Sequence, residues 1–124
     1  MTLEAITALN AETQDSSDSQ RVFAIAAELF GALSSPVRLK VLNILCDGER
    51  SVNELLAQID TTQPNLSQHL NLMYRSGILS RIKVGTQVIY KISSKTAAGL
   101  CRSVCTQIAI DLDELPTASK VRHY

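Results

Sequence analysis

No hydrophobic run in this chain of 124 residues approaches the roughly 20 consecutive apolar residues that a membrane-spanning helix needs. The start of the chain, Met1 to Glu4, lacks the basic residues and the apolar block of a signal peptide. Three cysteines are too few, and odd in number, for a secreted disulfide scaffold, so we expect free thiols in a reducing compartment. These absences predict a cytoplasmic protein with no membrane partner.

The sequence also lacks the patterns that a small enzyme would need. It has no Cys-x-x-Cys pair and no nucleophile spaced beside a general base, which argues against a thiol reductase. A hydrophobic content of 45% and a charged content of 19% are typical of a globular domain, and a chain of this length builds one core. We therefore expect a single domain that is not an enzyme and carries no cofactor.

Acidic residues are absent from the whole stretch between Thr61 and Ile110, although the net charge of the chain is zero. Nine acidic and four basic residues precede this stretch. A polyanion such as DNA would be attracted to the second half of the chain and repelled by the first half. A solvated surface of uneven composition is the alternative. The basic residues of the stretch are Arg75, Arg81, Lys83, Lys91, Lys95 and Arg102.

Polarity and helical spacing divide the chain into three parts. Residues 1–18 are predicted to form a flexible N-terminal arm, residues 19–113 one domain, and residues 114–124 a C-terminal tail. Within the domain, serines at helix-capping positions, a proline and a serine–glutamate capping box mark where helices start. The first four predicted helices cover residues 19–33, 36–46, 52–59 and 63–75.

After Gly77 the apolar period changes from 3.6 to 2. Residues 78–84 and 87–92 are predicted to form two strands joined by a two-residue turn. A last helix follows as far as about Leu112, and its continuous apolar stripe requires a large packing surface. The predicted fold is mainly α with a small β-hairpin, in which two short helices form a helix-turn-helix and the basic hairpin forms a wing.

Polar side chains crowd the first turns of the helix predicted over residues 63–75. Gln and Asn side chains can pair with adenine edges in the major groove, while Leu66 and Leu70 recur at the spacing that faces the core. An ordinary capped amphipathic helix would look similar, but the basic wing that follows favours DNA. Tyr90 is interpreted as core at the base of the wing. The predicted DNA contacts are Thr62, Gln63, Asn65, Ser67, Gln68, His69, Arg81, Lys83 and Lys91.

Four segments in this order resemble the ArsR/SmtB family of winged-helix repressors. They are residues 32–39 (ALSSPVRL), 48–55 (GERSVNEL), 62–70 (TQPNLSQHL) and the wing over residues 77–90. The resemblance implies a homodimer that represses from double-stranded operator DNA, with the long first and last helices at the dimer interface. A long apolar stripe on a short protein also needs a partner surface on physical grounds. A two-fold dimer would bind half-sites about 34 Å apart.

Members of this family release DNA when a metal or a reactive species binds, and two of the family's metal patterns are missing here. Where the third helix of the family begins with Cys-Val-Cys-Asp, this sequence has Ser51-Val52-Asn53-Glu54. The zinc site on the last helix needs acids and histidines, and His69 and His123 are the only histidines. We interpret His69 as a DNA contact. The resemblance therefore implies no metal site.

Three thiols remain as candidate sensing groups. Cys101 and Cys105 share one face of the last helix, about 6 Å apart along its axis, and Cys46 ends the second helix. One branch of the resembled family senses reactive sulfur or oxidants with one cysteine in each of these helices, at positions that match Asn43 and Ala109. Antiparallel helices would keep Cys46 and Cys105 opposed, because each is displaced by about one turn in opposite directions. The resemblance thus implies a redox pair of Cys46 with Cys105, or with Cys101, that releases the operator.

Three other interpretations stay open. The three thiolates could together hold arsenite, a soft trivalent ion, if all the sulfurs met at one point. The cysteines could instead be inert core residues, because free cysteine is among the most buried residue types. The winged helix could also bind a protein rather than DNA, and a strong salt dependence of DNA affinity would argue against that.

Overall fold

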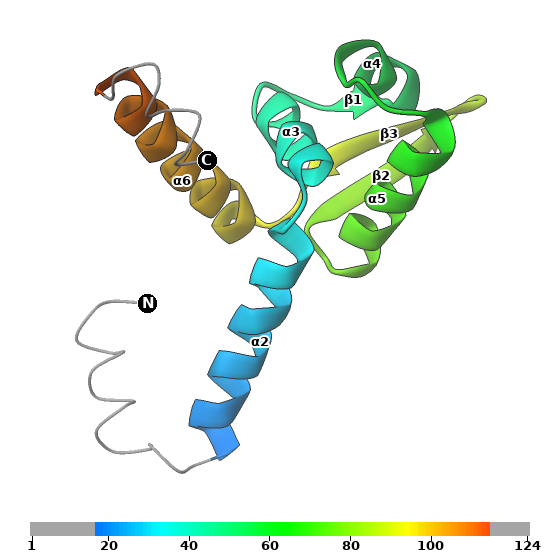
Figure 1. Cartoon of the computed structure of the whole chain (residues 1–124). Helices are drawn as coiled ribbons and strands as arrows, with labels where there is room; N and C mark the ends of the chain where they lie inside the picture. The colour runs from blue at the N-terminus through cyan, green and yellow to red at the C-terminus, as the bar shows by residue number, and fades with distance from the viewer. Residues whose placement is uncertain (1–16, 115–124) are drawn as a thin grey trace.

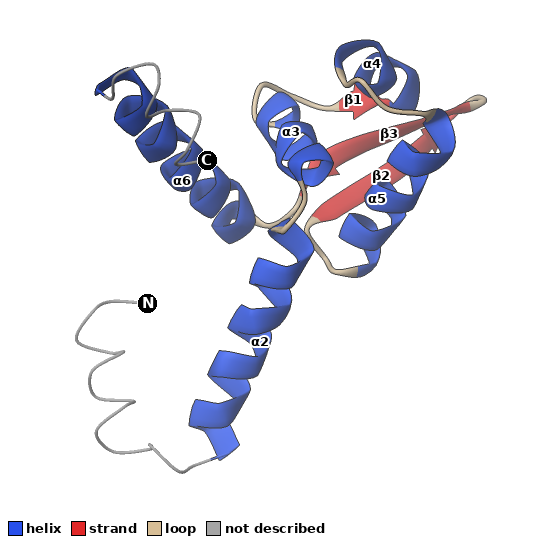
Figure 2. Ribbon diagram, viewed as in Figure 1, coloured by secondary structure: helices blue, strands red, loops and turns tan. Residues whose placement is uncertain are grey.

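The computed structural model describes residues 17–114, in which two long helices, α2 and α6, extend from a body of shorter helices and a small sheet (Figure 1). Figure 2 shows the hairpin projecting past α5 on the side of the molecule away from α6. In chain order the elements are α2 (Ser17–Leu33), α3 (Pro36–Leu45), β1 (Arg50–Ser51), α4 (Val52–Gln58), α5 (Gln63–Arg75), β2 (Leu79–Val84), β3 (Gln87–Ile92) and α6 (Lys95–Glu114).

The ends of the chain lie outside the described residues. The predicted arm over residues 1–18 is described only at Ser17 and Asp18, which belong to α2. The predicted tail over residues 114–124 is described only at Glu114, the last residue of α6. Both long helices therefore extend two residues beyond their predicted bounds.

The helix starts confirm the caps predicted from the sequence. Ser35 Oγ accepts a hydrogen bond from the Arg38 backbone N–H at 3.3 Å, and Pro36 is the first residue of α3. Ser51 and Glu54 form the predicted capping box, with hydrogen bonds of 3.1 and 3.0 Å at the start of α4. These starts are local properties of the chain, which is why the sequence alone located them.

A sharp bend of 91° separates α2 from α3. Pro36 disfavours a helical backbone in the preceding residue, and Ser35 is extended, with φ −154° and ψ 132°. Among residues 17–114 no single helix is long and apolar enough to cross a membrane, and α2 and α3 meet that test of length and composition only as a bent pair.

The predicted hairpin is present, and a third strand joins it. β2 and β3 pair antiparallel, with Val84 opposite Gln87, and Gly85 in the turn has a φ of 62° that favours glycine. β1 pairs Ser51 with Ile89 of β3, so the strand order is β1-β3-β2. The sequence did not predict β1 because two residues are too few to show an alternating pattern.

One hydrophobic core lies beneath α5. Leu66, Leu70 and Met73 on the inner face of α5 are all 0% exposed, as predicted for the two leucines. They form one cluster with apolar residues of α3, α4 and the sheet. Tyr90 is 5% exposed and belongs to this core at the base of the wing, as predicted. Because the core fixes one side of α5, the opposite side stays in solvent.

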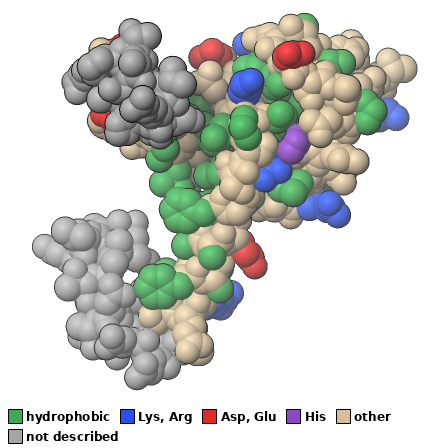
Figure 3. Space-filling model, viewed as in Figure 1, with side chains coloured by type: hydrophobic (Ala, Val, Ile, Leu, Met, Phe, Trp, Pro, Cys, Tyr) green, Lys and Arg blue, Asp and Glu red, His purple; other side chains and the backbone are tan. Residues whose placement is uncertain are grey.

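The two long helices keep much of their apolar surface in solvent. Phe23 and Phe30 of α2 are 62% and 59% exposed, and Val104 of α6 is 52% exposed. Figure 3 shows hydrophobic side chains gathered along α2. Among the α6 side chains that the structure describes, only Ala97 and Cys101, near the start of the helix, are buried. A single chain thus leaves uncovered the apolar stripes for which the sequence predicts a large packing surface.

Candidate nucleic-acid interface

Helix α5 carries the polar residues predicted to contact DNA on its solvent side. Thr62 caps the helix, and its Oγ1 accepts a hydrogen bond from the Asn65 backbone N–H at 3.3 Å. The Asn65 side chain donates to Thr61 Oγ1 at 2.7 Å, so it helps to hold the start of the helix. Gln63 and Ser67 are exposed, and their side chains form no hydrogen bond with another described residue. These two polar groups are therefore available to a ligand.

Gln68 lies at the centre of the exposed face of α5, because the helical period places it opposite the buried leucines. Its side chain forms no hydrogen bond within the described part of the chain. Asn71 and Arg75, three and seven residues further on, continue the same exposed face. Asn71 and Arg75 are not among the DNA contacts predicted from the sequence, although the helical period counted from Gln68 indicates both.

A polar hollow separates α5 from the tip of the wing. Its volume is about 400 Å³, and it lies between the start of α4, the first turns of α5 and the hairpin turn. The polar side chains around it face a space open to solvent. They belong to Ser51, Asn53, Gln63, Ser67, Thr86 and Gln87.

Arg81 holds the wing against α5 rather than projecting freely. Its guanidinium lies over the ring of Tyr74 on α5, 3.9 Å from the ring centre. Its Nη1 also donates to the Tyr90 hydroxyl at 3.3 Å. These contacts, first the hydrogen bond to Tyr90, raise the pKa of Arg81. The side chain predicted to contact phosphate is thus engaged within the chain, although it remains exposed.

The two wing lysines project from opposite faces of the hairpin. Lys83 lies opposite Val88 and shares a face with Arg81, which is the face that meets α5. Lys91 lies opposite Ser80, on the other face. The sequence predicted both as DNA contacts, but the structure brings only Lys83 to the side of the recognition helix.

The other flank of α5 is tied to the end of α2 by Arg38. Arg38 Nε donates to the Ala32 carbonyl oxygen at 2.7 Å, and Nη2 donates to the Gly31 carbonyl oxygen at 3.3 Å. Its Nη1 lies 2.9 Å from His69 Nδ1 on α5. Burial, with the positive charge of Arg38 as a second cause, lowers the pKa of His69 below 6.5. The contact could not be predicted from the sequence, because 31 residues separate the two side chains.

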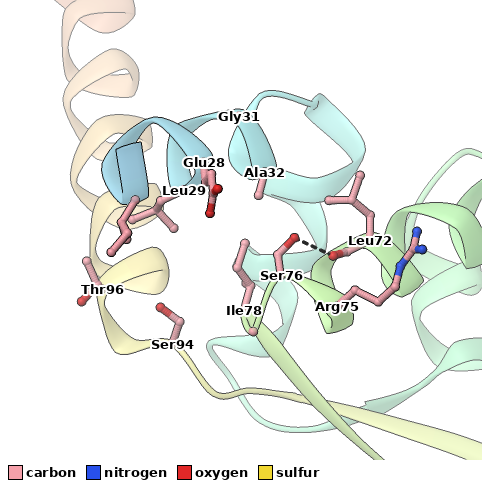
Figure 4. Close-up of a pocket in the computed structure, with 12 residues that line it drawn as sticks. Glu28, Leu29, Gly31, Ala32, Leu72, Arg75, Ser76, Ile78, Ser94 and Thr96 are labelled. Atoms are coloured by element: carbon pink, nitrogen blue, oxygen red, sulfur yellow. Dashed lines mark hydrogen bonds between the residues drawn. The ribbon is translucent and has the colours of Figure 1, made fainter. Parts of the chain in front are cut away.

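A cavity of about 720 Å³ lies beside this junction, between α2, the C-terminal end of α5 and the start of α6. Figure 4 shows Glu28 of α2 and Arg75 of α5 on different walls of it, and the Ser76 hydroxyl donating to the Leu72 carbonyl oxygen at 2.8 Å. Leu29 lines the α2 side. The last turn of α2 therefore borders an open hollow on this side.

The three thiols gather where α3 meets α6. Cys101 is buried, and its Sγ lies 4.0 Å from Sγ of the exposed Cys105 and 3.7 Å from the Leu39 carbonyl oxygen of α3. Cys46, the half-buried residue after α3, lines a cavity of about 270 Å³ together with Cys101. Cys101 is therefore the neighbour of both other thiols. Burial, followed by the neighbouring thiols, raises the pKa of Cys101 to about 11.

Metal-binding side chains do not cluster in the described part of the chain. Within residues 17–114 no group of three or more histidine, cysteine, aspartate or glutamate side chains is placed to hold a metal ion. The contact between Cys101 and Cys105 is a pair of thiols on adjacent turns of one helix. The arrangement of this pair is suited to thiol chemistry rather than to metal binding.

A polar helix seated on a helix-turn-helix core, with a basic hairpin beside it, defines a winged helix-turn-helix DNA-binding protein. Residues 35–81 match the family described as bacterial regulatory protein, arsR family. The chain belongs to this family, which is the one that the sequence motifs resemble. The structure thereby confirms the predicted fold class, with mainly helical secondary structure and a small antiparallel sheet.

Named relatives support the same class. A biofilm growth-associated repressor of Xylella fastidiosa is 40% identical over 85 residues, which cover 65% of this chain and 75% of that protein. The solved structure of reduced HlyU from Vibrio cholerae has a TM-score of 0.66 and 31% identity, covering 70% of this chain and 92% of that one. A homodimeric winged helix-turn-helix domain, Mb0332 from Mycobacterium bovis, has a TM-score of 0.70, covers 82% of this chain and 94% of that one, and at 23% identity shows the fold alone. The chain is therefore a transcriptional regulator and not an enzyme, as predicted.

The burial of Cys101 predicts that it reacts slowly with alkylating agents. At pH 8 iodoacetamide should modify exposed Cys105 first, because a thiol with a pKa of about 11 is almost wholly protonated there. Raising the pH by one unit should increase the Cys101 rate about tenfold, with its thiolate fraction. Mass spectrometry of the peptides measures both rates. Equal rates for the two thiols in the folded protein would contradict the assignment, and equal rates in denaturant are the control.

Proposed function

We propose that this protein is a dimeric repressor that binds operator DNA through α5 and the wing and releases it when its thiols are modified. The observation that carries the DNA assignment is the exposed face of α5. Its glutamines form no hydrogen bond within the described residues, and no acidic residue occurs between Thr61 and Ile110. A surface of unpaired amides without negative charge suits the edges of bases in a polyanion. Such a regulator acts where the chromosome lies, which agrees with the cytoplasmic location expected from the sequence.

We propose that side chains at the centre of α5 contact the DNA bases and that side chains on its two flanks contact the phosphates. Gln68 is exposed opposite the buried leucines of α5 and can pair bidentately with an adenine. The polar hollow of about 400 Å³ between α5 and the wing leaves room for one DNA backbone to pass, with Lys83 beside it. The proposed contacts are Thr62, Gln63, Asn65, Ser67, Gln68, His69, Arg81 and Lys83, to which the exposed face adds Asn71 and Arg75. Lys91, on the other face of the hairpin, is proposed only as a peripheral phosphate contact.

A second copy of the chain is the proposed cover for α2 and α6. Both helices expose large apolar side chains, among them Phe23, Phe30 and Val104, and such patches mark association sites. Mb0332 is described as homodimeric, and this fold is shared. A two-fold pair would present two copies of α5 to half-sites about 34 Å apart.

The thiols are the proposed sensor. Cys101 neighbours both Cys46 and Cys105, and HlyU, whose structure is described as reduced, is 31% identical. We propose that exposed Cys105 attacks a sulfane sulfur of a polysulfide, which breaks the S–S bond and forms a Cys105 persulfide and a shorter polysulfide anion. A second thiol then attacks Cys105 Sγ, a disulfide forms, and hydrosulfide leaves while the proton passes to solvent. Two thiols lose two electrons, and the sulfane sulfur gains them.

A disulfide that includes Cys46 would act on the DNA interface, whereas one within α6 would constrain only that helix. Cys46 follows α3, so a bond from it to Cys105 or Cys101 ties α6 to the helix that carries Arg38. Arsenite held by all three thiolates finds no support, because residues 17–114 contain no three-membered cluster placed for a metal. We therefore favour reactive sulfur or an oxidant as the inducer.

One substitution on α5 and one on each face of the wing test the DNA assignment. Gln68→Ala should weaken operator binding about fivefold to 150-fold by removing a base contact. Lys83→Ala should weaken binding to all sequences and reduce the slope of log affinity against log salt by about 1, through the loss of one phosphate contact. Lys91→Ala is the matched control on the opposite face and should change the slope less. Fluorescence anisotropy at several salt concentrations measures these affinities and slopes. Equal slopes for the wild-type, Lys83→Ala and Lys91→Ala proteins would contradict the assignment.

Treatment with polysulfide tests the sensor. The reduced protein should bind DNA from upstream of its own gene, lose about fivefold to 150-fold in affinity after treatment, and recover with reductant. Cys46→Ser should bind and fail to respond. A Cys46→Ser dimer that still loses affinity would show that the pair assignment is wrong. Unchanged affinity of the wild-type protein would leave the cysteines without a sensing role, and a response to arsenite alone would support the arsenite alternative.

A further inference from the structure

Arg38 joins two parts of the molecule through groups that a helix leaves unpaired. The carbonyl groups in the last turn of a helix have no partner within it. Arg38 Nε donates to one of these at the end of α2, the Ala32 carbonyl oxygen, and Nη2 donates to the Gly31 carbonyl oxygen, which also accepts from the backbone N–H and the hydroxyl of Ser34. The two bonds fix the plane of the guanidinium. Its remaining nitrogen, Nη1, is thereby aimed at His69 on the recognition helix, 2.9 Å from Nδ1.

The chemistry of the two groups decides where the His69 proton lies. A guanidinium has five N–H donors and no acceptor, so His69 Nδ1 must accept in this contact. A neutral imidazole that accepts at Nδ1 carries its proton on Nε2. The half-buried site beside Arg38 disfavours a second positive charge, so the imidazole stays neutral. Nε2 has no hydrogen-bond partner among the described residues.

We propose that Arg38 is a positioning residue that holds His69 in the Nε2–H tautomer, so that Nε2 donates a hydrogen bond to a phosphate oxygen of operator DNA. This assignment rests on the DNA interface proposed above. His69 lies on the flank of α5 that faces away from the wing, next to the α2–α3 junction. Contacts from the flank of a recognition helix fall on the backbone, whereas its centre meets the bases.

A phosphate contact of this kind has a distinctive salt dependence. Lysine and arginine release a bound counterion when they neutralise a phosphate, which produces the salt slope of DNA affinity. A neutral imidazole donates a hydrogen bond without neutralising a charge. His69 should therefore contribute to affinity and leave the salt slope unchanged, in contrast to Lys83.

The tautomer is measured directly in the protein without DNA. Long-range proton–nitrogen NMR spectra distinguish a protonated ring nitrogen from an unprotonated one, and His123→Asn leaves His69 as the only imidazole. At pH 7.5 we expect a protonated Nε2 and an unprotonated Nδ1. Arg38→Gln in the same background should give a mixture of tautomers. A protonated Nδ1 in the presence of Arg38 would overturn the proposal.

Two substitutions of His69 separate its two nitrogens. His69→Asn keeps an acceptor near the position of Nδ1 but removes the distal donor, and should weaken operator binding about threefold to tenfold with an unchanged salt slope. His69→Gln carries an amide N–H near the position of Nε2 and should retain affinity within about twofold. Arg38→Gln should weaken binding by about as much as His69→Asn, but should have little effect in the His69→Gln background.

The outcomes of these measurements are separable. Arg38→Gln and His69→Gln effects that simply add, or a salt slope that falls by about 1 in His69→Asn, would overturn the positioning role. Circular dichroism and thermal melting confirm folding, and Arg38→Lys, which cannot span the carbonyls and the imidazole together, replaces Arg38→Gln if the latter unfolds. If wild-type protein fails to bind any operator, the proposed DNA interface and the phosphate role fail together, while the tautomer spectra still decide what Arg38 does to His69.

Discussion

The burial of one face of α5 is the constraint on which the rest of the molecule depends. Leu66, Leu70 and Met73 lose all contact with solvent, and burying each such side chain contributes about 1.5–3 kcal/mol. A helix fixed along one side has no freedom to rotate, so Gln68 and its neighbours at helical spacing must face outward. The hydrophobic core thus sets the direction of the proposed DNA-binding face. The polar residues on that face do not affect its direction and need only be of types that can contact DNA.

One arginine on each flank refines the position of α5. Arg81 connects the wing to Tyr74, and Arg38 connects the end of α2 to His69. Both cations make contacts within the chain, and Arg81 remains exposed beside the proposed DNA interface. α3 also touches the thiols, since the carbonyl of Leu39, the residue after Arg38, lies 3.7 Å from Cys101 Sγ. We propose this contact between Cys101 and α3, the helix that carries Arg38, as the physical basis of the switch.

The sequence predicted what depends on neighbouring residues. Capping serines, Pro36 and the apolar period located α3, α4, α5 and the hairpin, and Ser51 with Glu54 formed the expected capping box. It did not predict β1, which has two residues, or the contact of Arg38 with His69, which depends on how distant helices pack. Which face of the hairpin each wing lysine occupies depends on the register of the strands, which only the structure shows. Spacing placed Cys101 and Cys105 on one face of α6, but only the structure shows that Cys101 neighbours Cys46.

The most direct test of the account is a backbone amide chemical-shift map of the labelled protein during titration with its operator. The account predicts that the largest changes fall in residues 62–69 of the recognition segment and in the wing around Lys83, on one continuous surface. At high salt the chemical-shift changes in the recognition segment and in the wing should diminish together, because both depend on the same phosphate contacts. Changes confined to α2 and α6, or to the face of the wing that carries Lys91, would contradict the central claim that α5 and the inner face of the wing form the DNA interface.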